Sequence, residues 1–491
     1  MSARLRAAVM VCEDWVAGAE IPGWSPEEDV EVHLVQGLCQ KPSRLGELLE
    51  RNRLDRLVLG LHGDRYGLAD VQAETRKLGL DPLGLEIVHL DGLDLGRGKR
   101  RFRAALARAR AFAGSRPEHA KLISARKVSR RALFRLALSE YLAAPAIDRS
   151  SCSSGIGCNA CAEICPQDAL SWANGRMEYD KGKCWPCGLC VTACPTGAIR
   201  NPAFTPSQIE AEIRMLLATA PDGLTGIVFH CQYGTPPSMA EGWMPVALPC
   251  AGMATPQWLL APLLMGATAV SVVPCPPECP GQQAWRIATH VRYCRALLYE
   301  LGADEDLVSL SLFAETPPPS SMERVDVEDP FAHDSGAAML DRFTATFTTD
   351  RITLEQPRSP VGLVTIGEAC TACGMCAESC PTGALGTDVD GDRFALTFDH
   401  ALCVACRQCL PRCPEIANRA ITLRQAMDTD LLRSGRRALH EAVILRCETC
   451  GAPISSEGMM DRIGELLGEE EGAMVSALSR SCSGCRMGLA P

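Results

Sequence analysis

The chain has 491 residues, 47% of them hydrophobic, and a net charge of −10, so it has room for about three or four globular domains. No apolar run approaches the roughly 18 residues of a membrane span, and the first residues lack the apolar region of a secretion signal. We therefore expect a cytoplasmic protein without membrane contact. Its 27 cysteines then indicate metal binding, because cytoplasmic thiols stay reduced and disulfide frameworks are typical of small secreted domains.

Two regions alternate short β-branched runs with amphipathic stretches. In residues 1–115 the runs LRAAVMVC, DVEVHLV, RLVLGLH and LEIVHL predict strands, and helices are expected from Pro42 to Arg51 and over LADVQAETRKLGL. Residues 223–313 repeat this rhythm with GIVFHC, MPVALPC, ATAVSVVPC and VSLSLF, and with helices from Pro256 to Met265 and from Gln282 to Glu300. Each region predicts a small α/β domain with a parallel sheet.

The remaining segments between cysteine-rich regions are basic or rich in proline. Residues 116–147 predict a basic helical connector, and residues 314–360 have the composition of a linker. From Arg97 to Arg135 there are 14 Lys or Arg and one Glu, so the rest of the chain carries −23. This segment is either a solvated helical face that offsets the acidic domains or a surface that docks a partner. Nucleic acid is not expected, because few aromatic residues are interleaved for stacking.

Sixteen cysteines form four tight groups that each end in Cys-Pro. The spacing C-x2-C-x2-C-x3-C-P directs three thiolates to one iron–sulfur cubane, while the fourth cysteine reaches the other cluster of the pair. Four [4Fe-4S] clusters are expected, with the ligand sets Cys152, Cys158, Cys161 and Cys194; Cys184, Cys187, Cys190 and Cys165; Cys370, Cys373, Cys376 and Cys413; and Cys403, Cys406, Cys409 and Cys380.

The first group departs from the regular spacing, which calls for a cysteine where the chain has Gly155. Cys152 is the nearest remaining cysteine, and the serines and glycines after it allow the chain to bend back. We expect Cys152 to be a displaced ligand of a [4Fe-4S] cluster. A [3Fe-4S] cluster and a ligand other than cysteine stay open as alternatives.

Both cysteine modules, residues 148–203 and 361–425, resemble the two-cluster domain of bacterial ferredoxins. The stretch with VFHCQYG, VALPCAGM and VVPCPPEC is similar to the delta subunit of methyl-viologen-reducing hydrogenase. That resemblance implies a [2Fe-2S] cluster on Cys231, Cys250, Cys275 and Cys279. Two departures put it in question, since His230 stands where the family usually has a second cysteine and the last pair is more closely spaced. Zinc or an empty thiol site is the alternative.

Residues 1–113 resemble the N-terminal domain of the heterodisulfide reductase A subunit, through VMVCEDW, GLCQKPSRL and RLVLGLHGDRYGLADVQAETRKLGLDPLGLEIV. The chain keeps only Cys12 and Cys39, with Asp14 and His62 at two positions where others are expected. We therefore expect buried strand-end cysteines here and no full cluster. No G-x-G-x-x-G follows a strand, so we expect neither FAD nor electron bifurcation within the chain.

The tail, residues 446–491, carries two C-x2-C pairs, Cys447 with Cys450 and Cys482 with Cys485. Tetrahedral S4 coordination suits structural zinc, which we expect, or rubredoxin-type iron. Cys294 lies within a helical stretch and is interpreted as a packed or free thiol.

These patterns predict an α/β and α+β multidomain protein that transfers electrons without a substrate site of its own. The resemblances imply redox partners in a heterodisulfide-reductase-like or hydrogenase-like complex, or a flavin or molybdenum dehydrogenase. One alternative is an iron–sulfur scaffold or redox sensor whose basic segment docks a partner. A weaker alternative is a self-sufficient reductase whose substrate binds at the [2Fe-2S] domain.

Overall fold

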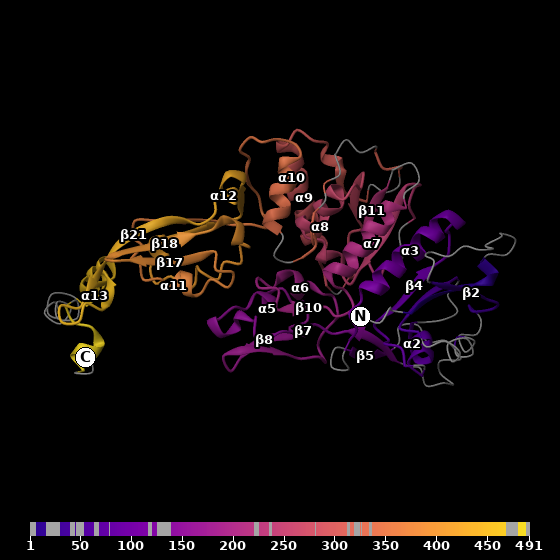
Figure 1. Ribbon diagram of the computed structural model, residues 1–491, viewed down its shortest axis with the longest axis horizontal. Helices are drawn as coiled ribbons and strands as arrows, with labels where there is room; N and C mark the ends of the chain where they lie inside the picture. The colour runs from indigo at the N-terminus through magenta and orange to yellow at the C-terminus, as the bar shows by residue number, and fades with distance from the viewer. Residues whose placement is uncertain are drawn as a thin grey trace.

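The computed structural model describes residues 6–15, 30–39, 45, 54–62, 68–77, 79–115, 120–124, 139–219, 225–234, 238–279, 281–311, 315–318, 325, 327–332, 336–467 and 480–487. Figure 1 shows an elongated molecule in which the two α/β domains and the first cysteine module lie together, and the second cysteine module and the tail extend away from them. No helix in these ranges is both long and apolar enough to cross a membrane.

The N-terminal domain is built on a parallel four-stranded sheet with the order β2-β1-β3-β4, as its strand and helix pattern predicts. Its elements are β1 (Ala7–Cys12), η1 (Glu13–Trp15), β2 (Glu31–Val35), β3 (Arg56–Leu61), α2 (Leu68–Lys77), β4 (Leu85–His89) and α3 (Leu95–Ala111). The central strand β1 is buried along its whole length. The helix expected from Pro42 to Arg51 lies almost entirely outside the described residues.

The central domain has a second parallel sheet, with the order β12-β11-β13-β14. Its elements are β11 (Gly226–Cys231), β12 (Trp243–Leu248), η5 (Ala251–Met253), α8 (Pro256–Leu264), β13 (Ala269–Val272), α9 (Ala284–Glu300), η6 (Glu305–Leu307) and β14 (Val308–Leu310). Helix α7 (Pro206–Ala218) precedes the sheet and was not predicted. Thr205 and Gln208 form a capping box at its start, a local signal that marks where the helix begins.

The two cysteine modules share a plan in which a β-hairpin separates the two cysteine groups. The first contains β7 (Ala146–Ile147), η3 (Ser153–Ile156), α5 (Ala160–Glu163), β8 (Leu170–Ala173), β9 (Arg176–Tyr179), α6 (Leu189–Ala193) and β10 (Ile199–Arg200). The second contains β16 (Leu363–Ile366), α11 (Met375–Glu378), β17 (Leu385–Asp390), β18 (Arg393–Phe398), η8 (His400–Leu402), η9 (Ile416–Asn418) and β19 (Ile421–Arg424). In both, the first and last strands pair antiparallel and close the module.

The chain that follows the second module continues its sheet and leads into the tail. The elements after the second module are β20 (Ala426–Asp428), α12 (Thr429–Arg433), β21 (Arg437–Arg446), β22 (Pro453–Ser456), α13 (Glu457–Leu467) and α15 (Ser483–Arg486). Strand β21 pairs with the hairpin strand β18, which makes a four-stranded sheet with the order β17-β18-β21-β22. The first C-x2-C pair of the tail follows β21 directly and is anchored to the second module by this sheet.

The prediction of a helical connector at 116–147 is wrong for the described residues of this segment. Strand β5 (Ala120–Ser124) pairs antiparallel with β6 (Ser139–Ala143). The Gln72 side chain on α2 then bonds the Tyr141 backbone twice, accepting from its N–H at 2.8 Å and donating to its carbonyl at 2.9 Å. These long-range pairings override the helix propensity of the Ala/Leu-rich sequence.

The linker expected at 314–360 also contains regular structure. Helix α10 (Gly336–Ala345) buries Met339, Leu340 and Phe343 in the core of the central domain. Strand β15 (Thr353–Glu355) pairs antiparallel with β20. The segment is therefore in large part a packed element of the fold, although its composition is typical of a linker.

The basic helix α3 is neither a solvated face nor, along its length, a free docking surface, because its arginines bind the central domain. Arg100 donates from Nη2 to the Leu216 carbonyl and to the Thr225 hydroxyl, both at 2.8 Å. Arg108 lies between two carboxylates, with its Nε 3.1 Å from Glu86 and its Nη1 3.0 Å from Glu212. Helix α3 packs beside α7 (Figure 1), and these contacts join the two α/β domains.

Replacing Arg108 with alanine should open this interface. The change leaves two buried carboxylates without their cation, which costs about 3 kcal/mol. We expect the backbone amides of α3 and α7 to exchange hydrogen for deuterium about 100-fold faster, measured by mass spectrometry at pH 7.5. Arg103→Ala removes the same charge from the same helix and is the matched control; equal exchange in the two variants would contradict the prediction.

The destabilisation of this interface by Arg108→Ala should also depend on pH. Burial raises the pKa of Glu86 to about 7, although Arg108 opposes the shift. A carboxyl with a raised pKa is protonated in the folded interface and ionised when the interface opens, so stability falls as pH rises from about 4.5 to about 7. Arg108→Ala should raise this pKa further. After correction for the intrinsic exchange rate, the excess exchange of the variant should be largest above pH 7 and smaller near pH 5.

Candidate electron-transfer centres

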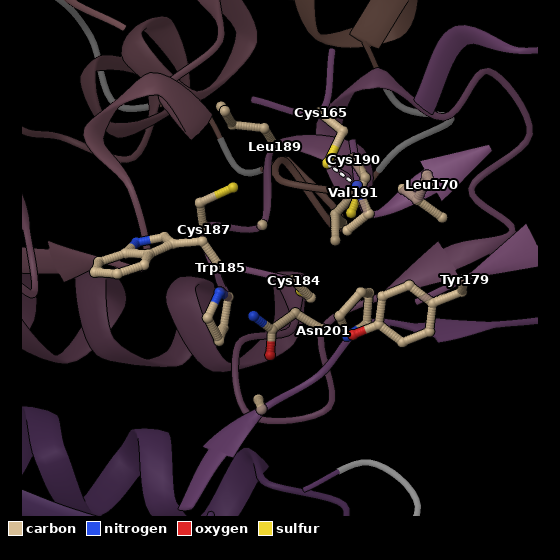
Figure 2. Close-up of a pocket in the computed structure, with 15 residues that line it drawn as sticks. Cys165, Leu170, Tyr179, Cys184, Trp185, Cys187, Leu189, Cys190, Val191 and Asn201 are labelled. Carbon is tan, nitrogen blue, oxygen red and sulfur yellow. Dashed lines mark hydrogen bonds between the residues drawn. The ribbon is translucent and has the colours of Figure 1, made fainter. Parts of the chain in front are cut away.

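The second cysteine group of the first module encloses a small cavity that Figure 2 shows. Its cysteines Cys184, Cys187 and Cys190 line this cavity together with Cys165 from the first group, which is the crossed set that the spacing predicts. Burial raises the pKa of Cys187 to about 11, and the charges of Cys184 and Cys165 add to the shift. Thiols of this kind ionise readily only when cations compensate their charge.

Gly188 allows the loop of this set to approach the central domain. Its φ of 75° is in the left-handed region, and a Cβ there would overlap the Met253 side chain. The next residue, Leu189, is fully buried and packs with Cys187 and with Cys250 of the central domain. The loop that carries Cys187 and Cys190 therefore packs against Cys250 of the central domain.

Cys152 lies close to the rest of the irregular group. It packs in one apolar cluster with Cys161 and Cys194. Burial raises the pKa of Cys161 to about 12, and negative charges on Cys194, Cys158 and Cys152 contribute to the shift. Gly155, where the regular motif has its cysteine, is exposed, and a Cβ there would meet nothing within 4 Å. The thiol of Cys152 is thus brought to the group, while position 155 faces away from it.

In the second module the same crossing occurs twice. One small cavity is lined by Cys403, Cys406, Cys409 and Cys380, and another is lined by Cys370, Cys373, Cys376 and Cys413. Ala372 and Ala405 precede the second cysteine of their groups and have φ of 52° and 53°. Alanine adopts this left-handed conformation at a cost of about 1–2 kcal/mol, so contacts around each loop hold it there.

The four cysteines predicted in the central domain lie together at the carboxyl edge of its sheet. Cys231 ends β11, Cys250 follows β12, and Cys275 and Cys279 follow β13. Cys250 and Cys275 share a hydrogen bond, which raises the pKa of Cys250 and lowers that of Cys275. Burial lowers the pKa of the adjacent His230 to about 4, so its imidazole is neutral at neutral pH.

The four tail cysteines form a more compact group. The sulfur atoms of Cys447, Cys450, Cys482 and Cys485 all lie within 4.8 Å of one another. Backbone N–H groups of Cys482 and Cys450 lower the pKa of Cys447 to about 5, which favours its thiolate. This spacing fits a single tetrahedral ion. Among the described residues, the cysteine sets of the two modules do not meet this spacing, in keeping with a larger occupant such as a cubane.

Neighbouring thiol sets lie near one another along the chain of domains. Cys187 packs in one cluster with Cys250 of the central domain. Within the first module, burial raises the pKa of Cys190, and the charge of Cys161 from the other set adds to the shift. Burial likewise raises the pKa of Cys406 to about 11, and the charge of Cys158 contributes. Because Cys158 and Cys406 belong to different modules, the two modules present their thiol sets to each other.

Direct bonds support this contact between modules. Arg412 Nη2 donates to the Ile156 carbonyl at 2.7 Å, and Gln408 Nε2 donates to Asn159 Oδ1 at 3.4 Å. Beyond the second module, Arg462 of α13 pairs at 2.9 Å with Glu415, close to Cys413. Helix α13 of the tail is therefore held beside the second module.

The 4Fe-4S dicluster domain family matches the chain twice, at residues 154–198 and 369–417. An uncharacterized ferredoxin of Methanocaldococcus jannaschii is 40% identical over 66 residues, which are 13% of this chain and 82% of the relative. The chain belongs to the dicluster ferredoxin family. Its two ferredoxin domains indicate [4Fe-4S] clusters and an iron–sulfur electron-transfer function.

Two further relatives match parts of the chain. A second uncharacterized ferredoxin of M. jannaschii is 51% identical over 39 residues, 8% of this chain and 26% of the relative. The formate dehydrogenase iron-sulfur subunit of Wolinella succinogenes is 36% identical over 104 residues, 21% of this chain and 50% of the relative. The chain thus spans about half of the latter and a quarter of the former.

Cys152→Ala should remove one iron per chain from the anaerobically purified protein. If Cys152 is the fourth ligand, its loss leaves three cysteines and converts one cubane to a [3Fe-4S] cluster. We expect the characteristic [3Fe-4S] electron paramagnetic resonance (EPR) signal in the oxidised variant, with iron counted by mass spectrometry. Cys294→Ala, which removes a fully buried thiol from α9, is the control; the same cluster content in both variants would exclude Cys152 as a ligand.

Proposed function

We propose that this protein is a relay subunit that carries electrons through a row of iron–sulfur clusters between partner oxidoreductases. The observation that carries the proposal is the succession of neighbouring thiol sets from the central domain to the second module. The four cysteines of the central domain adjoin the Cys184 set, which adjoins the Cys152 set, which adjoins the Cys403 set. The charge of Cys376 reaches Cys409, so the Cys370 set comes last.

The cofactors of the proposed relay are four [4Fe-4S] clusters in the crossed sets and one [2Fe-2S] cluster on Cys231, Cys250, Cys275 and Cys279. The position of that last set at the carboxyl edge of a parallel sheet, beside the Cys184 set, supports a redox role for it. The tail set, with its single-ion spacing, is proposed to hold structural zinc.

The proposed partner is an oxidoreductase that carries the catalytic cofactor. Similarity to an iron–sulfur subunit of formate dehydrogenase supports a dehydrogenase or hydrogenase complex of that general kind. The resemblances to the hydrogenase delta subunit and to heterodisulfide reductase point in the same direction. The scaffold alternative loses support, because the described α3 part of the basic segment binds the central domain.

The partner can be identified by purifying tagged full-length protein from its native host without oxygen. We expect a flavin or molybdenum oxidoreductase to co-purify, and its substrate to bleach the iron–sulfur absorption of this chain. Substrate omitted, or the partner alone, provides the control. A stable partner with no redox cofactor, or clusters that stay oxidised when substrate is added, would count against the relay.

Whether electrons cross the contact between the two ferredoxin domains can be tested by disturbing that contact. At Gly157, φ is 86° and a Cβ would overlap the guanidinium group of Arg412, so Gly157→Ala costs about 1–2 kcal/mol in the backbone and displaces the arginine. Gly155→Ala, two residues away in open space, is the matched control. We expect Gly157→Ala to weaken the magnetic interaction between the two facing clusters in the EPR spectrum of the reduced protein.

Gly157→Ala should also slow electron passage. In the complex with its partner, clusters on one side of the contact should still be reduced quickly, while those on the other side are reduced more slowly than in Gly155→Ala. Freeze-quench EPR separates the two groups. Equal reduction rates for all clusters in both variants would show that electrons do not cross this contact in sequence.

A further inference from the structure

A second compact group of metal-binding side chains lies far along the chain from the tail site. Cys12 is the last residue of β1, Cys39 follows β2, and His62 follows β3. These strands are neighbours in the parallel sheet, in the order β2-β1-β3. Carboxyl ends of parallel strands meet at one edge, which is where such sheets bind ligands. The three side chains therefore come from three adjacent strand ends.

The ligand atoms of this group have the spacing of a single-ion site. The two Sγ atoms and a ring nitrogen of His62 all lie within 4.8 Å of one another. The backbone N–H of Cys39 donates to Cys12 Sγ at 3.5 Å, and the N–H of His62 donates to Cys39 Sγ at 3.1 Å. These two backbone donors hold both sulfur atoms in place at the strand ends, close to each other and to the imidazole.

The histidine supplies an independent reason to place an ion here. Its Nε2 atom is buried and has no hydrogen-bond partner among the described residues. A buried polar atom without a partner destabilises the fold, so such atoms are rare unless something binds them. A disulfide between the two cysteines would leave that nitrogen without a partner, whereas an ion bound at Nε2 would satisfy it.

The charge balance of the site also favours a divalent ion. Cys12 and Cys39 are 0% and 3% exposed, so two thiolates there are costly unless cations compensate them. One divalent ion makes the set of two thiolates and a neutral imidazole electrically neutral. Zinc accepts this mixture of sulfur and nitrogen, and three protein donors leave one position of its tetrahedron for another ligand.

We propose that Cys12, Cys39 and His62 bind one Zn²⁺ ion that ties together the carboxyl ends of β1, β2 and β3. The ion is separate from the electron relay, and its ligand set differs from that of an iron–sulfur cluster, which the described cysteines of this domain are too few to hold. The site fixes the loop ends of a small sheet.

The test counts metals in the full-length protein, purified without oxygen and with its clusters intact. The tail group is first disabled by Cys450→Ser and Cys485→Ser, so that any zinc it holds is removed. In this background we expect about one zinc per chain, and we expect His62→Ala or Cys12→Ser to reduce it at least tenfold with the iron content unchanged. Zinc absorption spectroscopy should show two sulfur ligands at about 2.3 Å and one nitrogen at about 2.0 Å.

Two further variants keep the result interpretable if a substitution disturbs folding. His62→Cys should retain zinc and shift its ligands to three sulfurs, while Cys294→Ala should leave the zinc unchanged. Absence of zinc from the background protein would overturn the proposal, as would a Cys12–Cys39 disulfide found by mass spectrometry. A loss of several irons in His62→Ala would also overturn it, because that result indicates a cluster.

Discussion

The structure depends on the burial of thiols that come together from distant parts of the chain. Each regular set that lines a cavity combines three cysteines from one loop with a fourth from the other loop of its module, so both loops contribute to every such cavity. Burial opposes ionisation, as the raised pKa of about 12 at Cys376 and at Cys403 indicates. Bound cations offset this cost, so folding of these modules is coupled to metal binding.

Local patterns in the sequence account for most of the fold. The β-branched runs predicted the strands of both parallel sheets, and 22 residues between Cys380 and Cys403 predicted the β17–β18 hairpin. The crossed cysteine sets followed from spacing alone, because only a tight loop can direct three thiolates to one cubane. In these cases the determining interactions are close in sequence or repeat with a fixed period.

The features that were missed depend on contacts between distant segments. Nothing near Tyr141 in the sequence indicates that Gln72 will bond its backbone, so the Ala/Leu-rich connector was assigned as helical. The proline-rich composition before α10 concealed residues that pack into the central core. His62 was noted only as a replacement for a cysteine. Its proximity to Cys12 depends on the strand order, which a local pattern does not encode.

Several arginines join neighbouring domains in this acidic chain. Arg100 and Arg108 of α3 bind groups of the central domain, so the two α/β domains share a polar interface. Arg412 then joins one ferredoxin domain to the other, and Arg462 joins the tail to the second. Electron transfer between iron–sulfur centres requires fixed separations, and these arginines hold three pairs of neighbouring domains at defined contacts.

The irregular cysteine spacing of the first group occurs in a loop that contacts the second ferredoxin domain. Between Cys152 and Cys158 the chain forms the short helical turn η3 (Ser153–Ile156), which includes Gly155. That turn presents the Ile156 carbonyl to Arg412, and the left-handed Gly157 leaves room for the guanidinium group. A cysteine at 155 that pointed toward a cluster would draw this segment inward, away from the second ferredoxin domain. The loop that departs from the regular cysteine spacing is therefore also the loop that contacts the second ferredoxin domain.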